Sequence, residues 1–168
     1  MSPLTIELVK QVSGGSVLKC VRADGSVTWQ RNEGSRARFF PLHDLTHYAV
    51  ESVLGAADGF YGLIARGWEM TDTTGLGARG GLPDATIAIE HLVGLLDAER
   101  ASGTTITAVE VNKYSAEFAQ QQQRSGLPHL SDEILDRIRA EVARLHAAWT
   151  ALKPGETMTL LFSLPSSP

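Results

Sequence analysis

Hydrophobic residues alternate with polar ones near both ends of the chain. The segments 5–12, 17–22 and 27–30 are strand-like, and the turn signals Gly14-Gly15 and Asp24-Gly25 separate them. The segment 157–164 alternates most cleanly, and its apolar residues share one face: Met158, Leu160, Phe162 and Leu164. We predict an antiparallel meander over residues 4–31. The last strand should join the same sheet, because a single apolar face needs a partner layer.

The middle of the chain follows helical spacing instead. A helix is predicted from Phe39 to about Gly55, with Pro41 near its first turn, and an apolar segment at 60–68 predicts a second. Further helices are predicted over 84–100, over 114–124 and after a cap at Ser131. The segment 104–111 is rich in Thr, Ile and Val and is predicted to be a strand. The expected fold class is α+β: an antiparallel sheet, built from the N-terminal meander and the C-terminal strand, packed against several helices.

Composition narrows the class of protein. The chain has 168 residues, of which 43% are hydrophobic, and this favours one globular domain over residues 1–168. A net charge of -4 argues against a nucleic-acid partner. No apolar run is long enough to span a membrane, and the first residues do not resemble a signal peptide. The single cysteine, Cys20, excludes an internal disulfide and fits a cytoplasmic location. We expect a small-molecule substrate, whose identity the sequence does not give, and leave open a homo-oligomer. The tail 165–168 is expected to be loose.

Three side chains that can bind a metal recur at steps of four in the first predicted helix: His43, His47 and Glu51. Residues four apart lie on nearly the same side of a helix, so the two imidazoles can reach one ion. The Glu51 side chain leans back toward His47, and it would act as a ligand or orient His47 by hydrogen bonding. The remaining ligands should come from elsewhere in the chain: Glu69, Asp72 or His91. A divalent transition metal is therefore expected, with zinc as the first choice.

The segment His43-Asp44-x-x-His47 resembles the HExxH motif of zinc metalloproteases. The resemblance covers this one segment, and Asp44 stands where the motif has its general-base Glu, one methylene shorter. It implies two histidine ligands to zinc, with Asp44 as the proton acceptor. In the branch of that family whose third ligand is a Glu on a following helix, Glu69 is the loose match. The sequence from Pro41 to Tyr48 also resembles bacterial proteins of unassigned function.

Two functions follow from these patterns. The first is a metal-binding protein, a hydrolase if it is an enzyme. The second is a non-enzymatic module that binds a ligand or a partner and uses the His/Glu face structurally. Gly75-x-Gly77-x-x-Gly80 has the spacing of a dinucleotide fingerprint, but no strand is predicted before it and no helix begins within it. We therefore predict that residues 71–82 are irregular, bind no dinucleotide and suit a lid over a pocket.

Overall fold

A computed structural model of the protein describes residues 3–164 and shows four strands and five α-helices in that range. The strands are β1 (Leu4–Lys10), β2 (Ser16–Val21), β3 (Val27–Asn32) and β4 (Thr157–Phe162). The helices are α1 (Phe39–Leu54), α2 (Phe60–Ala65), α3 (Asp84–Ser102), α4 (Ala108–Gln122) and α5 (Asp132–Ala151). Two short 3-10 turns, η1 (Gly34–Arg36) and η2 (Asp72–Thr74), lie in the connections. The α+β prediction is confirmed.

The four strands form one antiparallel sheet in the order β3-β2-β1-β4. β4 lies beside β1, with Leu160 opposite Ile6 and Met158 opposite Leu8. The prediction that the last strand returns to the N-terminal sheet is therefore confirmed. The apolar face of β1 and β2 is buried, including Cys20.

The edge strand β3 has the opposite polarity. Its apolar residues Val27 and Trp29 are exposed on the outer face. Its inward residues are Thr28, Gln30 and Asn32, all polar, and the first and last of these are buried. A polar inner face on one strand of a half-buried sheet marks a region where the interior is not purely apolar.

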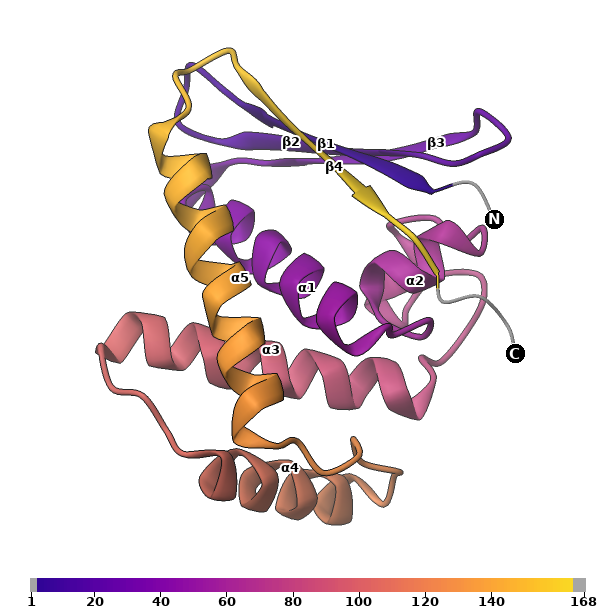
Figure 1. The fold of residues 1–168 in the computed structure, drawn as a ribbon. Coiled ribbons are helices and arrows are strands. Elements are labelled where there is room, and N and C mark those ends of the chain that lie inside the picture. Colours follow the sequence, from indigo (N-terminus) through magenta and orange to yellow (C-terminus); the bar gives the residue numbers. More distant parts are fainter. Residues whose placement is uncertain (1–2, 165–168) are drawn as a thin grey trace.

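All the helices lie on one side of the sheet (Figure 1). α1 lies next to the sheet, α3 lies beyond α1, and α4 is farthest away, while α5 runs from the level of α4 back to the sheet (Figure 1). Two apolar clusters fill the layers, one between the sheet and α1 and one between α1 and the outer helices. Because α1 is covered on both sides, even its polar residues are buried, including Asp44, Thr46, His47 and Glu51.

The predicted strand over Thr104 to Val111 is wrong. The chain there turns through an extended segment and enters α4 at Ala108. Thr107 caps the helix: its hydroxyl oxygen accepts from the Glu110 backbone N–H, and the Glu110 carboxylate accepts from the Thr107 N–H. This reciprocal capping box outweighs the β propensity of the preceding Thr and Ile residues.

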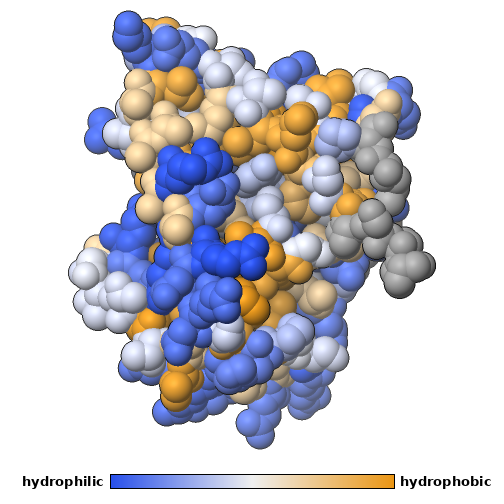
Figure 2. Space-filling view, viewed as in Figure 1, coloured by the Kyte–Doolittle hydropathy of each residue, from blue (hydrophilic) through white to orange (hydrophobic). Residues whose placement is uncertain are grey.

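The remaining connections agree more closely with the predictions made from the sequence. Residues 71–82 are irregular apart from η2, as predicted, and α2 ends at Ala65, a little earlier than expected. Within residues 3–164, no helix has the length and hydrophobicity needed to cross a membrane. On the face seen in Figure 2, hydrophobic residues appear along the sheet, and the surface over α4 is mainly hydrophilic. The tail 165–168 lies outside the described residues.

Candidate metal centre

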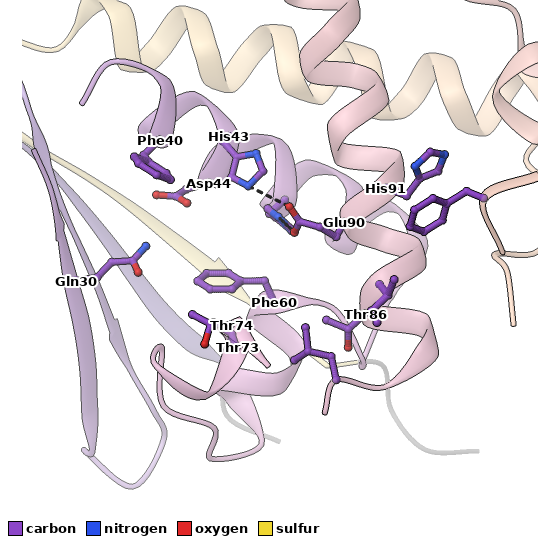
Figure 3. Close-up of a pocket in the computed structure, with 14 residues that line it drawn as sticks. Gln30, Phe40, His43, Asp44, Phe60, Thr73, Thr74, Thr86, Glu90 and His91 are labelled. Carbon is purple, nitrogen blue, oxygen red and sulfur yellow. Dashed lines mark ion pairs between the residues drawn. The ribbon is translucent and has the colours of Figure 1, made fainter. Parts of the chain in front are cut away.

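A cavity of about 550 Å³ lies between α1, β3, α2, η2 and the helices α3 and α4. Its lining combines apolar side chains with a small number of polar ones, as ligand sites do. Figure 3 shows these side chains converging from several elements, with α1 and α3 supplying the ionisable ones. The cavity is lined by Gln30, Phe40, His43, Asp44, His47, Phe60, Thr73, Thr74, Leu82, Thr86, Ile87, Glu90, His91 and Phe118.

His43 and His47 converge on one side of α1. Their ring centroids are 4.8 Å apart, and the planes of the two rings are nearly perpendicular. His47 is buried, whereas His43 is partly exposed. The predicted convergence of the two imidazoles is confirmed, because the four-residue step places both rings over the same turn of the helix.

Each imidazole has a carboxylate behind it. The Nδ1–H of His43 donates to Asp97 Oδ2 at 2.7 Å, and the Nδ1–H of His47 donates to Glu51 Oε1 at 3.2 Å. A carboxylate only accepts, so each ring carries a proton on Nδ1, and Nε2 is directed forward. The prediction that Glu51 lies within hydrogen-bonding reach of His47 is confirmed.

Both Nε2 atoms face Glu90 of α3. His47 Nε2 lies 2.9 Å from Glu90 Oε2, and His43 Nε2 lies 3.6 Å from Glu90 Oε1, an ion pair drawn as a dashed line in Figure 3. One ligand atom from each of these three residues lies within 4.8 Å of the other two. The pair of histidines and Glu90 therefore form a group that could hold a metal ion.

The two separations between the imidazoles and Glu90 fit a small divalent ion. In a tetrahedral zinc site with bonds of 2.0–2.2 Å, neighbouring ligand atoms are roughly 3.3 Å apart. The nitrogen–oxygen separations of 2.9 and 3.6 Å lie on either side of that value. If a tetrahedral ion were bound, two imidazoles and one carboxylate would leave its fourth position free.

Glu51 is enclosed by the segment that follows α1. Its Oε2 accepts from the backbone N–H groups of Tyr61 at 2.9 Å and Gly62 at 3.1 Å. Gly59 leaves the space that the carboxyl group needs, since a Cβ at that position would lie 2.2 Å from Glu51 Cδ. Burial raises the pKa of Glu51, although the hydrogen bonds from His47, Gly62 and Tyr61 act in the other direction. Glu51 is thus held to orient His47 from behind.

The charged groups of the centre shift one another's protonation. Burial disfavours the charged form of His47, but the carboxylates of Glu51 and Glu90 outweigh it and raise the pKa of His47 to about 10. The hydrogen bond from His47 in turn lowers the pKa of Glu90 against the opposing effect of burial. Without an ion, His47 is therefore protonated on both nitrogens, and a metal must displace the Nε2 proton.

Asp44 lines the same cavity from α1. Its carboxyl group is buried, and Oδ2 accepts a hydrogen bond from Asn32 Nδ2 at 3.3 Å. Burial raises the pKa of Asp44 to about 7, against the opposing effects of His43, His47 and the bond from Asn32. A carboxyl group that titrates near neutral pH is suited to accept or donate a proton.

Three further residues considered from the sequence lie outside the three-residue group. Glu69 pairs with Arg22 at 3.1 Å, and its side chain is half exposed. Asp72 accepts from the backbone N–H groups of Glu69 and Ala78 and so closes its own loop. His91 stacks on Phe118 with ring centroids 4.1 Å apart. Each of these three side chains therefore makes a contact that does not involve the His43/His47/Glu90 group.

Sequence reasoning missed Glu90 as a ligand and Asp97 as a partner of His43. The two acids are seven residues apart, so they lie two turns apart on the same side of α3, facing α1. Asp97 is buried next to the apolar residues Val93 and Leu96. An acid within an apolar stripe was the available signal, because a buried carboxylate needs a partner.

Searches with this chain against protein-family models, curated proteins and solved structures each returned no match.

Proposed function

We propose that the protein binds one divalent transition metal through His43 Nε2, His47 Nε2 and the Glu90 carboxylate, with zinc as the first choice. The observation that carries the proposal is the orientation of the two imidazoles. Both Nδ1–H groups donate to carboxylates behind the rings, and both Nε2 atoms point at a third carboxylate. Carboxylate–histidine–metal arrangements of this kind fix the tautomer and make the ligand nitrogen more basic.

Glu90 offers the clearest test. Its side chain is 58% exposed, so its removal should leave the fold intact, whereas His47→Ala would leave Glu51 buried without its partner. We expect purified protein supplemented with zinc to hold about one ion per chain, and Glu90→Ala to lose most of its affinity. Glu117→Ala is the matched control, because Glu117 lies on a helix and is 53% exposed. Equal metal content in the wild type and the Glu90→Ala variant would contradict the proposal.

The proposed activity is hydrolysis. A divalent ion with three protein ligands supplies Lewis acidity at its free position. Asp44 supplies the proton acceptor: its carboxyl group lines the same cavity, and Asn32 fixes its orientation.

The activity is tested separately from metal binding. With 4-nitrophenyl acetate as the probe, we expect Asp44→Asn to keep its zinc and to lose activity by about 10²-fold or more, the usual contribution of a general base. The asparagine side chain keeps the size of Asp44 and its acceptor oxygen. A variant that retains both zinc and full activity would exclude Asp44 from the reaction.

One observation favours the rival function, a module without catalysis. The ring nitrogens of His43 and His47 already face carboxylates, so the cluster is paired without an ion. If the protein takes up no transition metal after supplementation, this cluster is a structural ion-pair network that holds α1 against α3. The metal measurement thus decides between the two functions.

A further inference from the structure

The charged side chains that line the cavity gather at one end. Apart from His43, His47, Asp44 and Glu90, the wall is made of uncharged groups, and the ring of His91 stacks on Phe118. Among the described residues, no lysine or arginine lines the cavity. The apolar part of the wall is formed by Phe40, Phe60, Leu82, Ile87 and Phe118.

The hydroxyl groups of the three threonines in the wall already donate hydrogen bonds within the protein. The hydroxyl of Thr73 donates to the Met70 carbonyl at 2.7 Å, and that of Thr74 donates to the Thr71 carbonyl at 2.8 Å. The hydroxyl of Thr86 donates in the same way to the carbonyl of Asp58. A hydroxyl with its one proton engaged can only accept from a ligand. The cavity therefore offers mainly acceptor oxygens, and the amide of Gln30 is an uncharged donor in its wall.

The charge of the centre also disfavours anions. Four carboxyl groups surround the two imidazoles: Asp44, Glu51, Glu90 and Asp97. The opposing charge comes from Arg100, which donates to Asp97 at 3.3 Å, and from one divalent ion if it is bound. Even with the ion, three positive charges thus face four acids. The positive charge never exceeds the negative charge by enough to attract an anionic ligand.

We propose that this cavity takes an uncharged or cationic small molecule with an apolar body and with hydrogen-bond donors at its polar end. Amides and amines belong to this class, and carboxylates and phosphates do not. The proposal rests on the proposed function, because it takes the His43/His47/Glu90 group as the reacting end of the cavity. The phenylalanine side chains receive the apolar body, and the threonine and carboxylate oxygens receive the donors.

Three probes of nearly the same shape test the proposal: benzamide, benzamidine and benzoate. They share a phenyl ring and a planar three-atom end, and they are neutral, cationic and anionic at neutral pH. Binding is followed by chemical-shift changes of the backbone amides of Thr73, Thr74 and Thr86, with and without zinc. We expect benzamide and benzamidine to bind at least tenfold more tightly than benzoate to the zinc-free protein, and benzamide to keep that advantage with zinc. Benzoate binding as tightly as benzamide, or no binding by any probe, would overturn the proposal.

A single substitution should reverse the preference. Gln30 lines the cavity from β3, so Gln30→Lys adds a cationic donor without touching the three ligands. We expect benzoate to gain about tenfold in affinity and benzamidine to lose a similar factor. Val27→Lys is the matched control, because Val27 lies on the same strand and on its exposed outer face. An unchanged ranking in Gln30→Lys, or the same change in Val27→Lys, would count against the proposal.

The outcome separates the two proposals. If the protein binds no zinc but ranks the probes as expected, the metal proposal fails and the ligand class stands. If it binds zinc and prefers benzoate, the metal proposal stands and the ligand class is wrong. The two measurements share no readout, since metal content is read by elemental analysis and the probes by chemical shift.

Discussion

At the scale of single residues, Glu51 has two sets of partners. One carboxylate oxygen accepts a hydrogen bond from the Nδ1–H of His47. The other accepts hydrogen bonds from two backbone N–H groups at the start of α2. The side chain is completely buried, so its position is fixed by these bonds rather than by solvent. Glu51 therefore links the orientation of His47 to the chain that follows α1.

Glu51→Gln should weaken zinc binding without abolishing it. The amide keeps the size of the side chain but removes the negative charge behind His47, and the loss of such a partner typically lowers metal affinity 10–100-fold. Competition with a chromophoric chelator measures the change, and Glu133→Gln, at an exposed position of α5, is the control. Affinity unchanged in Glu51→Gln would show that Glu51 has only a structural role.

The raised pKa of His47 predicts how the stability of the metal-free protein depends on pH. Folded His47 keeps its second proton up to about pH 10, whereas in the unfolded chain the pKa is near 6.5. The folded state thus binds more protons at His47 in this window, so the contribution of His47 to stability is fully present below about pH 6.5 and is lost as the pH rises toward 10.

Urea unfolding of the metal-free protein at a series of pH values measures this dependence. With zinc bound, the Nε2 proton is already displaced, and the contribution of His47 to the slope should disappear. A midpoint that rises with pH between these limits in the metal-free protein would contradict the protonation of His47 described above.

At the scale of elements, the approach of α2 to α1 depends on Gly59. A Cβ there would lie 2.2 Å from Glu51 Cδ, a buried side chain that cannot move freely. We expect Gly59→Ala to lower the free energy of unfolding by about 1–3 kcal/mol, the usual cost of overpacking, and to weaken zinc binding by displacing Glu51.

Gly94→Ala is the matched control for that substitution. Gly94 lies within α3 on its exposed side, and a Cβ there would meet nothing within 4 Å. This substitution should stabilise the protein by roughly 0.5–1 kcal/mol, because alanine favours the helix. Denaturant unfolding measures both variants. Equal effects of the two substitutions would show that the contact with Glu51 is not the cause.

The start of α4 depends on one cap. Thr107→Ala removes the hydroxyl that accepts from the Glu110 N–H, and it should cost about 1 kcal/mol of stability. Thr104→Ala, in the exposed segment before the cap, should change stability by less than about 0.5 kcal/mol. A Thr107→Ala variant as stable as the wild type would mean that the cap does not define this helix end.

The elements that the sequence predicted correctly have strong local signals. The alternation from Met158 to Leu164 and the hairpin at Asp24-Gly25 identify strands without knowledge of their partners. The strand predicted at Thr104 to Val111 failed because propensity was given more weight than the Thr107–Glu110 capping pattern. Local patterns predict an element well, provided that its boundaries are read together with its composition.

At the scale of the whole molecule, the sequence predicts the two histidines of the candidate centre but not the two acids of α3 that face them. His43 and His47 share one helix, so their spacing alone brings them together. Glu90 and Asp97 reach them only because α3 crosses α1 at one particular place, and no local pattern specifies that crossing. The sequence of β3 shows only that apolar and polar residues alternate, and which of its two faces points inward depends on the side of the sheet that the helices cover.

The register of the sheet also brings the two ends of the described chain together. Leu4, at the start of β1, lies opposite Phe162, at the end of β4, and adjacent strands are about 5 Å apart. A short linker could therefore join the ends, and a cut at Ser13, in the exposed turn between β1 and β2, would create new ones. In this circular permutant β4 and β1 become a hairpin while every strand keeps its neighbours. It should fold with an unchanged circular dichroism spectrum, because all the strand pairings are kept and only the connections between elements change.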